Sequence, residues 1–424
     1  MSSRELLLGS FKAAVAAADP LHVVPPNLPK PPKGRTLVVG AGKAAAAMAL
    51  AVEQHWPSAA PLDGTVITRY AHGLLTNRIT VIEAGHPVPD EAGEAATKRI
   101  FDGVRRLSKD DLLLVLVSGG GSSLLSLPVD SISMADLKAI TTELLRCGAT
   151  IQKINTVRKH LSLIQGGRLA AACKANILAL VISDVTGDDP THIASGPCAP
   201  DPTTYRDALD ILESHGCRIP ETVRDTLARG IRGELAETPK PGDKAVFAKT
   251  ENRVIATAQQ SLLTAAKFFE SNGVPAVILG DSVTGEAREV AKAYAALARE
   301  VKARGQPWQP PVALISGGEC TVTVKGNGRG GRCAEFLLSL VNDLKGADGI
   351  HALACDTDGI DGTEDNAGAI AAPDSFTRAA AIGLRADKLL ENNDGYGFFS
   401  ALGDLVVTGP TRTNVNDYRV ILIA

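Results

Sequence analysis

The sequence predicts an α/β protein of two domains. Short runs of apolar and β-branched residues alternate with longer stretches whose apolar residues recur at helical spacing, and glycine or proline separates the two. The runs 112–117, 177–182 and 312–315 contain no polar position, a pattern typical of strands covered on both faces of a parallel sheet. With 424 residues and 45% hydrophobic content, the chain is long enough to fill two such cores.

The boundary between the domains is expected in residues 229–244, which are poor in apolar residues and contain Gly, Pro and mixed charges. We therefore expect a first domain over 1–235 and a second over 245–424. Residues 1–20 combine charged residues with apolar residues at helical spacing, which predicts an amphipathic helix and not a signal peptide.

Composition excludes several classes of function. The net charge of -3 and the lack of a basic cluster interleaved with aromatics argue against nucleic-acid binding. Seven cysteines, without a C-x-x-C pair, indicate buried thiols in a reducing compartment, so a cytoplasmic location is expected. No uncharged stretch is long enough to span a bilayer, and no membrane partner is expected.

A long polar loop, residues 182–204, follows the buried strand 177–182. It carries Asp184, Asp188, Asp189 and Asp201 but no Lys or Arg, so the carboxylates would repel one another without a bound cation. For any single Asp, a turn or a cap is the better explanation. For the cluster at the end of a buried strand, a functional site is favoured.

The first strand, 36–39, runs into Gly40-Ala41-Gly42-Lys43 and a helix predicted over 44–54. Free N–H groups and the positive helix end make such a junction an anion site, and Lys43 would strengthen it. The alternative is an exposed lysine that happens to begin a helix. Gly40, Gly42 and Ala45 match a dinucleotide-binding fingerprint, but no following strand ends in the acidic residue that this motif needs. The junction is not a P-loop either, since Ala44 follows Lys43.

Other strand ends carry similar polar groups. The turn 118–123, Ser-Gly-Gly-Gly-Ser-Ser, predicts a nest of backbone N–H groups for phosphate or carboxylate oxygens. Strand 312–315 ends in a related Ser-Gly-Gly-Glu, Arg332 begins a later helix, and Asp356 opens a second acidic loop. The basic segment 155–160 has two interpretations. Its basic groups could pair with the acidic loop or with a bound phosphate, or they could form a solvated face. His86 is interpreted as a turn residue.

Anion cradles, isolated cations and carboxylates for a hard divalent cation are the components of phosphoryl transfer, where positioning and charge neutralisation supply most of the catalysis. The sequence therefore predicts a nucleotide with Mg²⁺ as its cofactor.

Several segments together resemble one known family, the glycerate 2-kinases of type II, which end in a MOFRL domain. The segments are GAGKAAAAMA, AGHPVPD, VSGGGSSLL, NTVRKHLS, IQGGRLA, SDVTGDDPTHIASGP, PDPTTY, ISGGECTVTV, GRGGR, DTDGIDGTEDNAGA and TGPTRTNVND. The resemblance covers nearly the whole chain. It implies a Rossmann-like first domain with a mainly parallel sheet. It also implies a three-layer α/β/α second domain with a mixed sheet, whose MOFRL region covers about 310–420, and an active cleft between the two.

The resemblance also implies a reaction, the ATP- and Mg²⁺-dependent phosphorylation of D-glycerate to 2-phosphoglycerate. Lys43 and Arg332 would neutralise the transferring phosphoryl group and the glycerate carboxylate, and Asp184 would accept the C2-hydroxyl proton. Asp189 and Asp356 would hold magnesium. Substrate and nucleotide would bind to Gly40, Gly42, Ser118, Gly119, Gly120, Gly121, Ser122, Gly317, Gly318, Glu319 and Asn416. The family usually has Asn-Gln-Glu after the GGR of this motif, where this chain has Cys333-Ala334-Glu335.

Two other functions stay open. Family members have been labelled hydroxypyruvate reductases, and the Gly40-x-Gly42-x-x-Ala45 pattern would suit NAD(P)H. A non-catalytic metabolite sensor would need the acidic loops to be idle. The sequence leaves undecided the oligomeric state, a homodimer included, the exact hydroxy-acid acceptor, the domain that binds adenine, and the division of base and metal roles among the aspartates.

Overall fold

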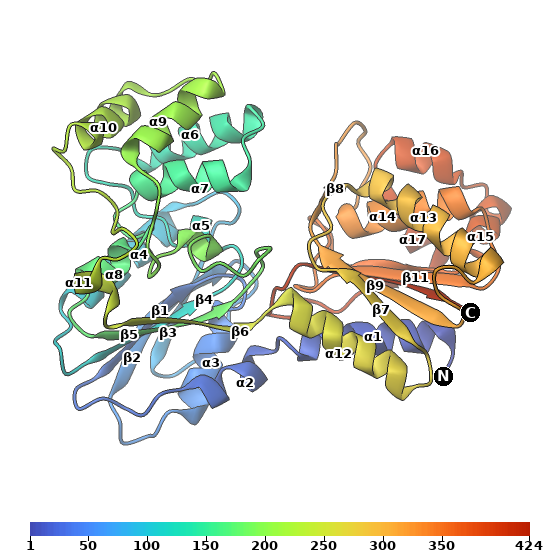
Figure 1. The fold of residues 1–424 in the computed structure, drawn as a ribbon, viewed down its shortest axis with the longest axis horizontal. Helices are drawn as coiled ribbons and strands as arrows, with labels where there is room; N and C mark the ends of the chain where they lie inside the picture. Colours follow the sequence, from blue (N-terminus) through green and yellow to red (C-terminus); the bar gives the residue numbers. More distant parts are fainter. The chain divides into compact units, whose positions relative to one another are not determined.

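The structure, a computed structural model, describes residues 1–424 and divides into two compact units (Figure 1). The N-terminal unit is Pro20–Ile255, and the C-terminal unit combines Met1–Asp19 with Ala256–Ala424. Each unit contains one six-stranded sheet with helices packed on it, so the predicted α/β class is confirmed.

The sheet of the N-terminal unit is all-parallel, with strand order β3-β2-β1-β4-β5-β6. This is the order of a Rossmann fold, in which ligands bind at the carboxyl ends of the strands. The predicted Rossmann-like topology is therefore confirmed. The strands are β1 Thr36–Ala41, β2 Leu62–Arg69, β3 Ile79–Ala84, β4 Leu112–Val117, β5 Asn176–Ile182 and β6 Thr250–Ala256.

The helices of this unit form two groups. The first group lies against the sheet or in its connections and contains α2 Pro20–Val23, η1 Pro25–Asn27, α3 Ala45–His55, α4 Glu91–Arg105, α5 Gly121–Leu124, α8 Arg168–Ala172, η2 Ile193–Ser195 and α11 Lys244–Phe247. The second group has an apolar core of its own and lies apart from the sheet in Figure 1. It contains α6 Met134–Arg146, α7 Ile151–His160, α9 Tyr205–Ser214 and α10 Glu221–Ile231.

The sheet of the C-terminal unit is mixed, as expected, with strand order β13-β12-β11-β14-β9-β7. Only β7 and β9 pair in parallel, and the other neighbours are antiparallel. The strands are β7 Ala276–Gly280, β9 Val312–Gly318, β11 Ile350–Asp356, β12 Gly368–Ala371, β13 Leu405–Val406 and β14 Asp417–Ile423. A separate two-stranded pair joins β8 Gly285–Glu286 to β10 Cys320–Thr321.

Helices cover both faces of this mixed sheet, which gives three layers (Figure 1). One apolar core lies between the sheet and the pair α1 Ser3–Ala16 and α12 Ala258–Ser271. The other core contains residues of α13 Ala287–Arg304, α14 Arg332–Leu344, α15 Ser375–Ala381, α16 Ala386–Glu391 and α17 Gly395–Leu402.

The structure divides the chain at other positions than the sequence predicted. The first sheet extends through β6, so residues 245–255 belong to the N-terminal unit. Helix α1 belongs to the C-terminal unit, where the Ser10 hydroxyl bonds the Tyr418 hydroxyl at 2.9 Å and Arg4 pairs with Asp404 at 3.0 Å. Linker-like composition marks an exposed connection, and an amphipathic pattern does not reveal which core receives the helix.

No single helix is both long and apolar enough to cross a membrane. Helix α1 and the following segment Pro20–Asn27 meet the length and composition criteria only as a pair bent by 45°. In the structure the apolar residues Leu6, Leu7 and Phe11 of α1 are buried in the core of the C-terminal unit.

Candidate functional site

The turns that follow β1 and β4 are hydrogen-bonded to each other. These strands are neighbours in the sheet, so both turns lie at one edge. The Lys43 N–H donates to the Gly119 carbonyl at 2.9 Å, and the Ala44 N–H donates to the Ser118 Oγ at 3.0 Å. The Ser118 N–H donates in turn to the Ala41 carbonyl at 3.2 Å. The structure thus brings together two glycine-rich turns that the sequence predicted separately.

Two of the predicted binding glycines are required by this close packing. A Cβ on Gly40 would lie 2.0 Å from the Leu116 carbonyl oxygen. Gly42 has a φ of +138°, and a Cβ there would lie 2.1 Å from the Ser118 Oγ. Both residues therefore let the backbones of neighbouring turns approach each other, whatever they also do for a ligand.

The sequence predicted a helix that starts directly after Lys43. In the structure, one residue separates Lys43 from the helix. Helix α3 begins at Ala45, Ala44 is its N-cap, and Lys43 precedes the cap. The N–H groups of Lys43 and Ala44 are bonded to the β4 turn, and that of Ala45 donates to the Gly42 carbonyl at 3.1 Å. These three donors are used inside the protein, so they are not free to bind an anion.

The β4 turn also brings His86 close to Lys43. Gly120 has a φ of +81°, and a Cβ there would lie 2.9 Å from the His86 Nε2 and 3.6 Å from the Lys43 Cγ. Asp90 holds the turn that carries His86 by accepting the Gly85 N–H at 2.8 Å. The sequence analysis interpreted His86 only as a turn residue and did not predict that it lies beside Gly120. Its place shortly after β3, at the same edge of the sheet, was the available signal.

The long loop after β5 packs against the same turn. The Ser195 hydroxyl shares a hydrogen bond of 2.9 Å with the Ser122 hydroxyl. Ala194 and Ser195 have φ values of 49° and 58°, in the left-handed region. This conformation costs on the order of 1–3 kcal/mol for each such residue, and costs of this kind are typical of functional segments.

The predicted catalytic and metal-binding aspartates of this loop differ in environment. Asp184 follows β5 after Ser183 and is partly buried. Asp189 is exposed and accepts the Thr191 N–H at 2.9 Å, as in an Asx-turn. Partial burial raises the pKa of Asp189, but its hydrogen bonds with Thr191 outweigh that effect and lower it. Asp189 is thus suited to act in the ionised form.

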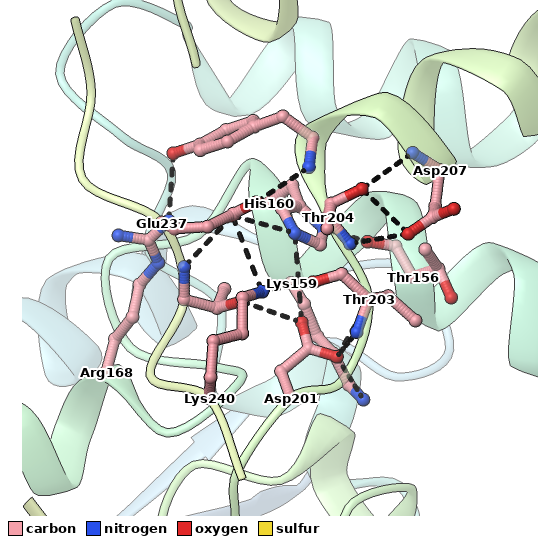
Figure 2. Close-up of polar contacts among 12 residues, drawn as sticks. Thr156, Lys159, His160, Arg168, Asp201, Thr203, Thr204, Asp207, Glu237 and Lys240 are labelled. Carbon is pink, nitrogen blue, oxygen red and sulfur yellow. Dashed lines mark hydrogen bonds and ion pairs between the residues drawn. The ribbon is translucent and has the colours of Figure 1, made fainter. Parts of the chain in front are cut away.

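Asp201 has a structural partner that the loop itself does not contain. Figure 2 shows its carboxylate beside Lys159 of α7, with an Nζ–Oδ1 distance of 3.5 Å. Both side chains are buried, and the hydroxyls of Thr203 and Thr238 donate to Asp201 at 2.7 and 3.1 Å. The basic segment therefore answers the acidic loop, and the inference of a bound cation from missing countercharge does not hold for Asp201.

The same buried cluster contains Glu237 and His160 (Figure 2). The Glu237 Oε1 lies 3.2 Å from the His160 Nε2 and 3.7 Å from the Lys240 Nζ. Partial burial opposes ionisation of Glu237, but His160 and Lys240 lower its pKa to about 2. This cluster connects α7 to the segment between α10 and α11, and it holds the end of the loop 182–204 in place through Asp201.

The C-terminal unit has its own cluster of charges around Arg332, the first residue of α14. The guanidinium contacts Glu319 at 2.6 Å, Asp356 at 2.8 Å and Asp417 at 2.7 Å. The other oxygen of Asp417 pairs with the buried Arg419 at 2.7 Å. Burial lowers the pKa of Arg332, but Asp417 and Asp356 raise it well above its ordinary value.

Asp361, which the sequence did not single out, lies at the N-terminus of α14. It accepts the N–H groups of Cys333 at 3.0 Å and Ala334 at 2.8 Å. A Cβ on Gly331 would lie 2.2 Å from its Oδ1, so the glycine is needed there. A cation at this helix start suggested an external anion, but the protein's own carboxylates occupy both the helix end and Arg332.

Burial of Asp361 makes the stability of the C-terminal unit depend on pH. Burial raises its pKa from 3.8 to about 6, despite the hydrogen bonds from Cys333 and Ala334. The folded state therefore binds the proton more tightly, and the stabilisation present below pH 3.8 is lost as the pH rises through 6. The loss amounts to roughly 3 kcal/mol.

Asp361→Asn should remove this dependence. Other groups titrate in both proteins, so the measurement is the difference in unfolding free energy between wild type and variant in urea at several pH values. The wild type should lose stability relative to the variant as the pH rises from 4 to 6, and the difference should then stay level. A difference that is constant across this range would contradict the assignment.

The remaining predicted binding residues of this unit frame the Arg332 cluster. The carbonyls of Gly317 and Gly318 accept from the Arg419 guanidinium at 3.2 and 3.3 Å. Asn416 has a φ of 66°, and its carbonyl accepts the Thr357 hydroxyl at 2.6 Å. The structure thus brings Gly317, Gly318, Glu319, Arg332, Asp356 and Asn416 together in one cluster.

No three His, Cys, Asp or Glu side chains lie together so that they could hold a metal ion by themselves. Asp189 and Asp356 belong to different units. Asp356 uses its Oδ2 on Arg332 and its Oδ1 on the Asp358 N–H, and Asp189 uses its Oδ1 on Thr191. Mg²⁺ in nucleotide sites takes one or two carboxylates together with substrate phosphates. A single carboxylate oxygen from either aspartate fits that chemistry, whereas a closed protein cage does not.

Comparisons with known proteins cover the whole chain. Residues 6–228 match the model described as "Domain of unknown function (DUF4147)", and residues 312–417 match the MOFRL family. A relative from Agrobacterium vitis, named putative hydroxypyruvate reductase, is 50% identical and covers 100% of this chain and 95% of its own. A Thermotoga maritima relative named D-glycerate 2-kinase is 40% identical, with 100% and 99% covered.

Solved structures are similar over the same length. The crystal structure of a glycerate kinase from Thermotoga maritima superposes with a TM-score of 0.88 at 38% identity, covering 99% of both chains. A Pyrococcus horikoshii protein of known structure superposes with a TM-score of 0.82, also at 38% identity, over 100% of this chain and 99% of the other.

Proposed function

Because this chain belongs to the glycerate kinase family with DUF4147 and MOFRL domains, we propose that it is a glycerate 2-kinase, which uses ATP and Mg²⁺ to phosphorylate D-glycerate to 2-phosphoglycerate. The family resemblance predicted from the sequence motifs is confirmed, and kinase relatives near 40% identity support a kinase activity. The acceptor, the position of phosphorylation and the residue roles are the proposal.

The observation that carries this proposal is the arrangement around Gly120. Lys43 and His86 flank this glycine, which belongs to a turn at the carboxyl edge of a Rossmann-like sheet. Gly119 and Ser118 tie the turn to the backbone that carries Lys43. A cation fixed in this way is suited to charge that develops on a phosphoryl oxygen.

The chemical step needs one base and several cations. Asp184 accepts the proton of the C2 hydroxyl while that oxygen bonds to the γ-phosphorus of ATP, and the bond to the bridging oxygen breaks to release ADP. Lys43 stabilises the negative charge of the transferring group. Asp189 or Asp356 would hold Mg²⁺, which when bound would supply positive charge to neutralise the nucleotide.

Arg332 can receive a substrate anion by exchanging one of its partners. Asp356 and Asp417 are buried, with side-chain exposures of 6% and 0%, whereas the Glu319 side chain is 56% exposed. An exposed ion pair is weak, so breaking the contact to Glu319 costs less free energy than breaking either contact to a buried aspartate. A carboxylate or phosphate of the substrate replaces Glu319 on the Arg332 Nη1, and the two buried aspartates keep the guanidinium in place.

The test uses the pure protein with MgATP and D-glycerate. ADP should form together with 2-phosphoglycerate, which enolase converts to phosphoenolpyruvate without a mutase, and EDTA should abolish the reaction. No ADP with D-glycerate would overturn the proposal. A product that enolase accepts only after addition of phosphoglycerate mutase would place the phosphate on C3 and overturn the 2-kinase assignment.

The second candidate is an NAD(P)H-dependent hydroxypyruvate reductase. The name of the Agrobacterium vitis relative and the Rossmann strand order with Gly40 and Gly42 favour it. Two observations oppose it. The N–H groups of Lys43, Ala44 and Ala45 are bonded inside the protein, and β2 ends in Arg69 where NAD enzymes carry an acid. Arginine there suits the 2′-phosphate of NADPH, so NADPH oxidation with hydroxypyruvate and without ATP is the reaction to test.

A further inference from the structure

Two polar side chains of α7 lack the partners that buried polar groups need. Asn155 is 4% exposed, and its Oδ1 has no hydrogen-bond partner. Arg158 is partly buried and makes no hydrogen bond or ion pair. Burial lowers its pKa to about 10, and no neighbouring charge acts on it. Unpaired groups of this kind destabilise a protein, so their presence calls for an explanation.

The two side chains share one face of α7. Residues three positions apart are neighbours on a helix surface, so Asn155 and Arg158 lie together. Lys159 and His160 belong to the buried cluster with Asp201 and Glu237 (Figure 2). The acids of that cluster pair with Lys159 and His160, and they make no ion pair with the Arg158 guanidinium.

The location of α7 relates this face to the candidate site. Helix α7 packs against η2, which contains Ser195. The Ser195 hydroxyl bonds Ser122 of the glycine-rich turn, and that turn contains Gly120 beside Lys43 and His86. The segment with Asn155 and Arg158 is thus one packing layer away from the turn, within the same unit.

We propose that Arg158 and Asn155 bind the hydroxy-acid substrate. The guanidinium fork of Arg158 donates two hydrogen bonds to the carboxylate, and the Asn155 Oδ1 accepts a hydrogen bond from a hydroxyl of the same molecule. An unpaired donor beside an unpaired acceptor matches a carboxylate that carries a neighbouring hydroxyl. This inference rests on the proposed function, and it names a substrate contact which neither the family motifs nor the relatives' names assign.

A nucleotide offers similar chemistry through a phosphate and a ribose hydroxyl, so the experiment has one arm for each ligand. Calorimetric titration would measure the Kd of D-glycerate and, separately, the Kd of ATP. Arg158→Met should weaken D-glycerate binding by about 30-fold, as expected for one charge-assisted pair. Asn155→Ala should weaken it by about 5-fold. The affinity for ATP should stay unchanged in both variants.

Arg206→Met is the matched control, because Arg206 lies on α9 of the same unit, is exposed, and has only a 4.0 Å contact to Asp210. Its two affinities should equal those of the wild type. Arg158→Lys keeps the charge but not the fork, so its Kd for D-glycerate should lie between those of the wild type and Arg158→Met. It also provides the comparison if the methionine variant does not fold.

An unchanged Kd for D-glycerate in folded Arg158→Met would overturn the inference. A loss of ATP binding with intact D-glycerate binding would overturn it in favour of a nucleotide contact. If the wild type binds D-glycerate but does not phosphorylate it, the proposed reaction fails while the affinity of Arg158→Met still decides the inference. If the wild type binds no D-glycerate, the inference is wrong.

Discussion

Lys43→Met should lower kcat by about 100-fold or more, the loss typical of one preorganised electrostatic contact in the transition state. Methionine keeps most of the apolar stem and removes the charge. The backbone N–H of residue 43 would still donate to the Gly119 carbonyl, so the two glycine-rich turns should stay joined. The ligand-free melting temperature should stay level or rise slightly, because a cation close to a helix N-terminus is repelled by the helix dipole.

The control for this variant is Lys98→Met, on the exposed face of α4 in the same unit. It should leave both kcat and melting temperature unchanged. Both quantities should be measured on one preparation of each protein. A Lys43→Met protein with normal kcat, or one whose activity is lost only because it melts early, would show that Lys43 has no catalytic role.

Arg332→Met should destabilise the C-terminal unit by about 3–5 kcal/mol, the cost of breaking a buried ion pair from one side. The variant would leave Asp356 and Asp417 with less countercharge at side-chain exposures of 6% and 0%. Activity should be lost as well, since the proposal places Arg332 in the site, so stability is the measurement that separates the two effects.

The position of the two tryptophans allows a measurement of this unit alone. Trp56 lies in the N-terminal unit and Trp308 in the C-terminal unit. In a Trp56→Phe background, the urea unfolding curve followed by fluorescence reports Trp308, and its midpoint should fall strongly with Arg332→Met.

Arg329→Met provides a matched control for this prediction. Arg329 pairs with Glu364 at 61% side-chain exposure and should contribute less than about 1 kcal/mol. Asp356→Asn in the Arg332→Met background should recover part of the lost stability, because it removes a buried charge that has lost its partner. A midpoint as little changed as that of Arg329→Met would show that the cluster does not stabilise the unit.

The local structure of this chain could largely be predicted from the sequence. The runs 112–117 and 177–182, in β4 and β5, are unbroken and apolar because both faces of the sheet are covered, so every position of these two runs is buried. The turn after β4 could be located by its three consecutive glycines, and Gly120 does adopt a positive φ. Helix α3 begins one residue later than predicted, which is the usual uncertainty at a helix end.

The partners of the charged residues could not be predicted in this way. Asp201 finds its countercharge on Lys159, and Arg332 finds its anions on Glu319, Asp356 and Asp417. The absence of Lys or Arg within a loop says nothing about a lysine that the fold brings to it from an earlier helix. Missing countercharge near Asp201 and a cation at the start of α14 therefore do not by themselves indicate an external ion.

By itself, then, the sequence determined what depends on neighbouring residues and on ordered motifs: the α/β class, the buried parallel strands, the glycine-rich turns and the family. Only the tertiary structure decided that α1 packs in the C-terminal unit, that β6 completes the first sheet, and that His86 lies beside Lys43. Periodicity reports which face of an element is apolar, because burial is a local requirement repeated along the chain. Which distant side chain meets that face, or answers a given charge, depends on packing between segments far apart in the sequence, and no local pattern encodes it.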